Sequence, residues 1–170
     1  MFLIYFGFLA VLNMSDLGAV EIPEDLQNAK YITVSEKNDG FGSQLKRRMS
    51  AIAFASVHKK VYVHTPFVEL QHNYDSRPDF HNLMELFANV GFGFPRGDSL
   101  GGINVYERED YCYYTDQDID KYYNDKVLSL LRRNYYSTPK NKIAYFDRKF
   151  VNVAVHMRRG DVIDTGPVGM

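Results

Sequence analysis

Two adjacent arginines follow a strongly apolar segment in the last part of the chain. Residues 150–155, Phe-Val-Asn-Val-Ala-Val, predict a buried strand that leads directly into His-Met-Arg-Arg-Gly-Asp at 156–161. Ligands of open α/β sheets bind just beyond the carboxyl ends of strands. Arginine side chains placed there are planar, permanently charged forks that suit phosphate oxygens. The pattern predicts a site for a phosphate-bearing ligand, and the alternative is a strand end whose arginines are only solvated.

A second segment with this kind of chemistry lies nearer the start of the chain. Residues 39–45, Asp-Gly-Phe-Gly-Ser-Gln-Leu, follow a predicted strand at 31–34 whose side chains are β-branched or aromatic. Gly40 and Gly42 free the backbone for a tight turn. Apolar residues then recur every three or four positions, which predicts a helix over 44–57.

Three cations lie in or beside the first turn of that helix: Lys46, Arg47 and Arg48. This end of a helix dipole disfavours positive charge, by tenths of a kcal/mol for each residue. A bound anion would offset that cost, so we expect at least one of the three cations to face a ligand. The alternative is that they only make an exposed turn soluble.

Both segments resemble motifs of one enzyme superfamily. The block at 156–161 is similar to the His-x-Arg-Arg motif of the α1,2-, α1,6- and protein O-fucosyltransferases, and residues 39–45 are similar to their glycine-rich first turn. Two motifs in the family's order, about 115 residues apart, are much harder to obtain by chance than either alone. The resemblance is concentrated in residues 30–65 and 150–162.

The resemblance implies a GT-B enzyme that transfers fucose from GDP-fucose to a glycan or protein hydroxyl with inversion, with no metal cofactor. Arg158 and Asp39 are the implied catalytic residues. Arg158 would neutralise the diphosphate, and Asp39 would be the general base that accepts the proton of the acceptor hydroxyl. The alternative for Asp39 is an ordinary aspartate in a turn. The other implied substrate-binding residues are His156, Arg159, Asp161, Gly40, Gly42, Gln44 and Arg47.

The elements that must position these residues alternate as strand, turn, helix and strand, with the next strand predicted at 61–64. This order predicts an α/β fold with a parallel sheet, which corresponds to the N-terminal half of a GT-B architecture. We expect an apolar segment and linker at 1–28, a Rossmann-like acceptor-side domain at 29–148 and the start of a nucleotide-sugar-binding domain at 149–170.

Two domains of about 150 residues each would complete a GT-B enzyme. The 170 residues are therefore expected to be a fragment that is inactive alone. Its binding of GDP-fucose is expected to be very weak or undetectable, because the guanine and ribose pockets of the superfamily come from later strands and loops.

Patterns between 65 and 149 are weaker. Residues 83–87 predict a helix, the five glycines and one proline of 91–104 predict a loop, and 116–133 predicts one further helix with its cations in the last turn. Seven tyrosines between 111 and 136 could stack on sugars, but half-buried packing on amphipathic helices is the favoured interpretation.

Composition excludes several classes of function. A formal net charge of -1 gives no reason to expect a nucleic-acid partner, which would normally require a strongly basic face. Cys112 is the single cysteine, which rules out an intrachain disulfide and a cysteine-based zinc site. The five histidines show no metal-binding spacing.

Residues 1–12 are almost entirely apolar. They are shorter than the ~20 residues that cross a bilayer, and no Lys or Arg precedes them as in a signal peptide. Three interpretations stay open: a degenerate signal or signal-anchor, a buried strand, or a wrongly assigned start. The first would place the protein in the secretory pathway, in the Golgi or ER, with a membrane anchor through these residues; otherwise the protein is cytoplasmic.

Two functions of other classes are alternatives to the transferase. One is a non-catalytic remnant that folds and binds a partner but holds no nucleotide. The other is an adhesion module that uses Arg-Gly-Asp at 96–98, although no disulfide scaffold is available to display that loop. The partners expected for the transferase are a sugar nucleotide and a glycan or protein acceptor.

Overall fold

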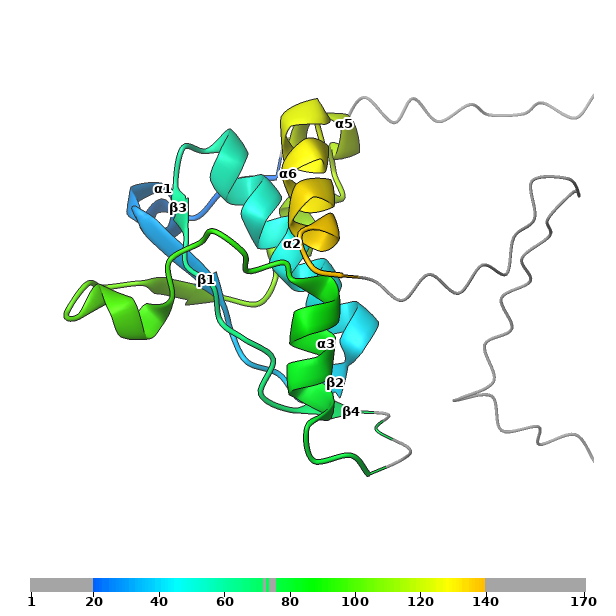
Figure 1. Cartoon of the computed structure of the whole chain (residues 1–170). Helices are drawn as coiled ribbons and strands as arrows, with labels where there is room; N and C mark the ends of the chain where they lie inside the picture. Colours follow the sequence, from blue (N-terminus) through cyan, green and yellow to red (C-terminus); the bar gives the residue numbers. More distant parts are fainter. Residues whose placement is uncertain (1–19, 72, 74–75, 140–170) are drawn as a thin grey trace, which may run out of the picture. The chain divides into compact units, whose positions relative to one another are not determined.

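The computed structural model describes residues 20–71, 73 and 76–139 (Figure 1). The chain divides into two units, 1–139 and 140–170, and the described residues all belong to the first. Their fold is mixed α/β with short parallel strands in open sheets, which confirms the predicted class. No helix in this part of the chain is long and apolar enough to cross a membrane.

A three-stranded parallel sheet lies at the centre of the unit, in the order β3-β1-β5. Strand β1, Tyr31–Val34, pairs with β3, Val61–Tyr62, on one side and with β5, Tyr106–Arg108, on the other. The β-branched side chains of β1 are buried, as expected for a strand covered on both faces. Strands β1 and β3 were predicted, whereas β5 was not.

Helix α2, Phe41–Val57, connects β1 to β3 and carries much of the core. It contacts the sheet as well as the later helices α4, α5 and α6 (Figure 1). The predicted helix is confirmed, but it begins at Phe41 rather than at residue 44. Of the apolar residues predicted to face the core, Ile52 is fully buried, while Leu45 and Met49 are half-buried against the same core.

The tight glycine turn predicted at 39–42 is wrong. Strand β2, Asp39–Gly40, pairs in parallel with β4, Leu70–Gln71, and α2 follows it directly. The backbone at Gly40 is extended, with φ -64° and ψ 152°, so the conformation does not require glycine. A long-range strand pair therefore replaces the local turn.

The remaining helices are short. They are α1, Glu24–Asn28; α3, Phe80–Ala88; the 3₁₀ helix η2, Gly97–Leu100; α4, Tyr111–Thr115; α5, Ile119–Tyr122; and α6, Asp125–Tyr136. Helix α3 confirms the prediction at 83–87. The single helix predicted at 116–133 is wrong, because two N-caps divide the segment. The Asp118 side chain accepts from the Lys121 N–H, and the Asn124 side chain accepts from the Val127 N–H.

Tyrosine packing is confirmed in the core. Tyr111, Tyr114 and Tyr122 are buried around Phe54 of α2, with ring centroids 5.4 to 6.1 Å apart. Aromatic rings at such distances stabilise a core beyond their buried area. The exposed exceptions are Tyr113 and Tyr136.

Candidate functional site

The first candidate site is the edge of the sheet where β1 ends. Residues 35–38 lead from β1 to β2 there, and segment 65–69 leads from β3 toward β4. The Gln44 side chain joins the two, because Nε2 donates to the Lys37 carbonyl at 2.7 Å and to the Glu69 carbonyl at 2.6 Å. Gln44 is buried, and both of these bonds connect protein segments. Gln44, which was predicted to bind substrate, therefore holds two segments of the protein together.

Asp39, the predicted base, is held by three donors. The Gly40 N–H donates to Oδ1 at 2.7 Å, and Ser43 Oγ donates to Oδ2 at 2.6 Å. Arg47 Nη2 lies 2.8 Å from the same Oδ2, and only 10% of the Arg47 side chain is exposed. The Ser43 and Gly40 bonds and the Arg47 charge hold the pKa of Asp39 below its ordinary value. Since a lower pKa means a weaker base, catalysis by Asp39 would require a ligand to displace some of these donors.

Arg48 is the most buried cation at this edge, with 2% exposure. It donates to the Thr65 and Pro66 carbonyls, both at 2.9 Å, and to the Gln44 carbonyl at 3.1 Å. Its guanidinium lies 4.0 Å from the centroid of the Phe67 ring. Burial lowers the pKa of Arg48, although an arginine stays charged in a protein. The sequence predicted an exposed or ligand-facing residue here, whereas the structure uses the charge to hold segment 65–67.

Lys46 is the accessible cation of the three. Its Nζ lies 2.7 Å from Asp116 Oδ2, and both side chains are about half exposed. An exposed pair of this kind contributes little to stability and is readily exchanged for another anion. Of the three cations, Lys46 therefore has the partner that a ligand could most easily replace.

The space at this edge is small. A cavity of about 150 Å³ lies between loop 36–38, the buried pair Gln44 and Arg48, and residues 68–69. Pockets for cofactor-sized ligands are about 300–1,000 Å³, so the described residues do not enclose a sugar nucleotide here. Beside Gly42, a Cβ atom would meet nothing within 4 Å, so the first turn of α2 is open to an approaching group.

The arginine block at 156–161 lies outside the described residues, as does the apolar strand predicted before it. Consequently His156, Arg158, Arg159 and Asp161 have no place in the geometry given above. The same holds for residues 1–12.

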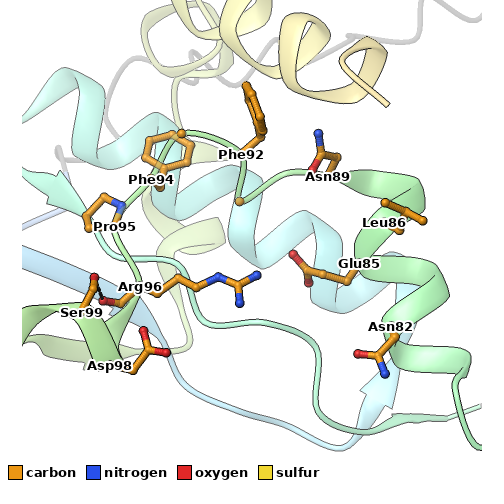
Figure 2. A pocket seen from close by; sticks show the side chains of 12 residues that line it. Asn82, Glu85, Leu86, Asn89, Phe92, Phe94, Pro95, Arg96, Asp98 and Ser99 are labelled. Carbon is orange, nitrogen blue, oxygen red and sulfur yellow. Dashed lines mark hydrogen bonds between the residues drawn. The ribbon is translucent and has the colours of Figure 1, made fainter. Parts of the chain in front are cut away.

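A larger cavity, of about 540 Å³, lies between the end of α3 and loop 91–99. Figure 2 shows the Arg96 side chain reaching across it toward the carboxylate of Glu85. Glu85 Oε1 lies 2.6 Å from Nε2 of the buried His64, and its Oε2 accepts from the Phe67 N–H at 3.2 Å. Burial alone would raise the pKa of Glu85, but these bonds and the Arg48 charge bring it below its ordinary value.

Sequence reasoning missed this cavity, although one signal pointed to it. The glycines of 91–104 were interpreted only as a loop. Gly91 packs so closely on His64 that a Cβ atom would lie 2.2 Å from the imidazole Cδ2. Arg96, the first residue of the Arg-Gly-Asp sequence, forms a β-bridge with His64, and Gly97–Leu100 continue as a 3₁₀ helix.

Within residues 20–71, 73 and 76–139, no group of three or more His, Cys, Asp or Glu side chains could hold a metal ion. The chain matches no family model, no curated protein and no solved structure.

Proposed function

We propose that this chain is part of a GT-B fucosyltransferase, which transfers fucose from GDP-fucose to a glycan or protein hydroxyl with inversion. The described residues would form most of its Rossmann-like acceptor-side domain, which is predicted over residues 29–148. One observation carries the proposal: the Asp39–Arg47 pair belongs to the connection that follows the carboxyl end of the central parallel strand β1, the side on which open sheets bind ligands. The resemblance of both sequence motifs to the fucosyltransferases names the ligand.

In this mechanism the arginines act on the leaving group. Arg158 would neutralise the diphosphate as the bond to fucose breaks, and Arg159 and His156 would position it. Charge-assisted contacts to phosphate are the strong ones, because a planar guanidinium can donate twice. Asp39 would accept the proton of the attacking hydroxyl after the acceptor displaces the Ser43 hydroxyl or Arg47.

A non-catalytic binding module is the second candidate. It is favoured by the internal use of Gln44 and Arg48, whose hydrogen bonds hold segments of the protein together. In that case the edge of the sheet would be a structural junction rather than a donor site.

Ligand-observed NMR on the 170-residue chain tests the proposal, with GDP-fucose as the probe and UDP-glucose as the comparison nucleotide. One or two charge-assisted contacts, each about 1.5–3 kcal/mol, leave little after the cost of association. We expect a dissociation constant for GDP-fucose in the millimolar range, about 4 kcal/mol of binding. Saturation transfer should be lost in Arg158→Ala and weaker for UDP-glucose.

Arg132→Ala is the matched control, because Arg132 is an exposed arginine on α6. It should leave the GDP-fucose signal unchanged. Equal signals from the wild type and Arg158→Ala would overturn the donor assignment, and so would equal transfer from UDP-glucose.

A further inference from the structure

The larger cavity carries opposite charges on two facing walls. Glu85 lies on α3, and Arg96 lies on the loop that follows, with its side chain directed across the cavity toward the Glu85 carboxylate (Figure 2). Among the described residues, no ion pair or hydrogen bond engages the Arg96 guanidinium. The two charges therefore face one another without closing the space between them.

One buried residue fixes both walls of the cavity. His64 is 1% exposed, and its Nε2 lies 2.6 Å from Glu85 Oε1. Its main chain holds the other wall, because the His64 N–H donates to the Pro95 carbonyl at 2.8 Å and the residue forms a β-bridge with Arg96. Gly91 packs against the imidazole with no room for a side chain. The fold itself therefore sets the separation between the Glu85 carboxylate and the backbone of Arg96.

Both carboxylates of the lining can accept further hydrogen bonds. A carboxylate has about four lone-pair positions, and Glu85 uses two of them, for the His64 ring and for the Phe67 N–H. Asp98 lies on η2 and is exposed, as is Arg96. Among the described residues, the charged lining of the cavity is thus one guanidinium and two carboxylates. A ligand that matches it carries one anionic and two cationic groups.

Simple ions fit this lining badly. A phosphate on Arg96 would meet the Glu85 carboxylate on the opposite wall, and a metal ion on the carboxylates would meet the guanidinium. Like charges placed against one another cost several kcal/mol. A dipolar ion avoids both conflicts, because its anionic end can face Arg96 while its cationic end faces Glu85.

We propose that this cavity binds a free basic α-amino acid, arginine or lysine. The α-carboxylate would accept from the Arg96 guanidinium, whose planar fork suits two parallel hydrogen bonds. The α-ammonium would donate to Glu85, and the cationic side chain would lie against Asp98. The volume of about 540 Å³ lies within the range of small-molecule sites. The cavity shares no lining residue with residues 35–40, so this site is separate from the proposed donor site and does not rest on it.

Ligand-observed NMR titrations on the 170-residue chain, at constant ionic strength, test the site with arginine and three analogues. Arginine methyl ester lacks the carboxylate, N-acetylarginine lacks the α-ammonium, and citrulline lacks the side-chain charge. We expect a millimolar dissociation constant for arginine. Each analogue should bind about fivefold more weakly, the scale of one exposed charge pair.

Substitutions assign each charge of the ligand to its wall. Arg96→Ala should weaken arginine binding about fivefold but leave the methyl ester unchanged, because that analogue has already lost the partner of Arg96. In the same way, Asp98→Asn should weaken the binding of arginine but not of citrulline. Glu85→Gln, checked for folding by circular dichroism, should weaken arginine but not N-acetylarginine. The matched controls Arg132→Ala and Asp120→Asn remove exposed charges on α6 and α5 and should change nothing.

Three results would overturn the inference. One is the absence of saturation transfer to arginine at about 50 mM. Another is arginine binding that both Arg96→Ala and Asp98→Asn leave unchanged in folded protein. The third is an affinity for the methyl ester or for inorganic phosphate equal to that for arginine, which would mean that the cavity selects a single charge. Arg158→Ala should leave arginine binding intact, and Arg96→Ala should leave GDP-fucose binding intact, so the two proposals fail separately.

Discussion

The polar side chains at the end of β1 and those around the cavity beside α3 differ in burial and in hydrogen bonding. At the end of β1, Gln44 and Arg48 are buried, and their hydrogen bonds go to backbone carbonyls of the protein. Around the cavity, Arg96 and Asp98 are exposed, and the Glu85 carboxylate is held at the surface of an open space. A ligand at β1 must displace existing contacts, whereas a ligand in the cavity would add contacts to groups that are already exposed.

A conspicuous sequence motif and an accessible site therefore need not coincide. The cations in the first turns of α2 are conspicuous in the sequence because they oppose the helix dipole. In the structure, an ion pair with Asp39 stabilises Arg47, and neutral oxygens stabilise Arg48. The open polar groups belong to a segment whose sequence predicted only a loop. Four substitutions can break or sharpen this contrast.

Arg48→Ala should have the largest effect. It leaves the carbonyls of Thr65 and Pro66 without the Arg48 donors, and each unsatisfied buried group costs about 1–3 kcal/mol. We expect the free energy of unfolding in urea to fall by about 3 kcal/mol or more. Arg132→Ala, on an exposed face, should change it by less than about 0.5 kcal/mol. A loss below about 1 kcal/mol for Arg48→Ala would mean that water reaches these oxygens, and the contrast would disappear.

Gly91→Ala should come next. The added methyl would lie 2.2 Å from His64 Cδ2, and a buried ring has little room to move, so overpacking should cost about 1–3 kcal/mol. Gly97→Ala is the matched control, because a Cβ atom there meets nothing within 4 Å. Urea unfolding of both variants measures the difference. Equal stabilities would show that the floor of the cavity is loosely packed.

Asp39→Asn should have a smaller effect that depends on pH. The pKa of Asp39 is lowered in the folded protein, by the Ser43 and Gly40 hydrogen bonds and then by Arg47. The carboxylate therefore stabilises the fold above its unfolded pKa, and that contribution is lost as the pH falls below about 4. We expect a contribution under about 1 kcal/mol, since the pair is partly exposed.

Urea unfolding at pH 7 and at pH 3 measures this contribution. The stability of the wild type should fall more between these values than that of Asp39→Asn. Parallel losses would indicate that the ion pair with Arg47 contributes nothing, and the β1 edge would then be more open to ligands than its geometry implies.

Phe92→Ala should have the smallest effect on stability. Its ring is 53% exposed, so we expect a change within about 0.5 kcal/mol. Phe67→Ala, by contrast, removes a buried ring under Arg48 and should cost about 3–5 kcal/mol. Thermal unfolding of the two variants provides the comparison. A loss of about 2 kcal/mol or more for Phe92→Ala would show that the ring is a packing residue.

Much of the first half of the unit was predictable from local patterns. The β-branched run at 31–34 and the periodicity after residue 44 predicted β1 and α2. The strand predicted at 61–64 is β3, although the structure limits it to Val61–Tyr62. The later elements were harder. Strand β5 is short and partly exposed, and its pairing with β1 leaves no periodic signal. The sequence after residue 116 contains the residues that divide the predicted helix. Their role as N-caps, Asp118 for α5 and Asn124 for α6, was not predicted.

The types of residue at the candidate sites could be predicted, but their burial and their contacts could not. Asp39, Gln44 and Arg47 do lie together at the end of β1, as the strand-to-helix order required. The hydrogen bonds of these residues could not be inferred from the sequence, because they depend on segment 65–69 and on the pairing of β2 with β4. His64 and Glu85 lie on different elements, and no spacing rule joins them.

The sequence by itself determined the alternation of strand, helix and strand, since backbone propensity and hydrophobic period act over neighbouring residues. It also determined which chemical groups are available, including the arginines at 158 and 159. Only the tertiary structure decided that Arg48 is buried, that β1 is the central strand, and that Arg96 and Phe92 border an open cavity. The reason is that burial and cavity shape depend on contacts between segments far apart in the chain, and their energies are known only once those segments are packed.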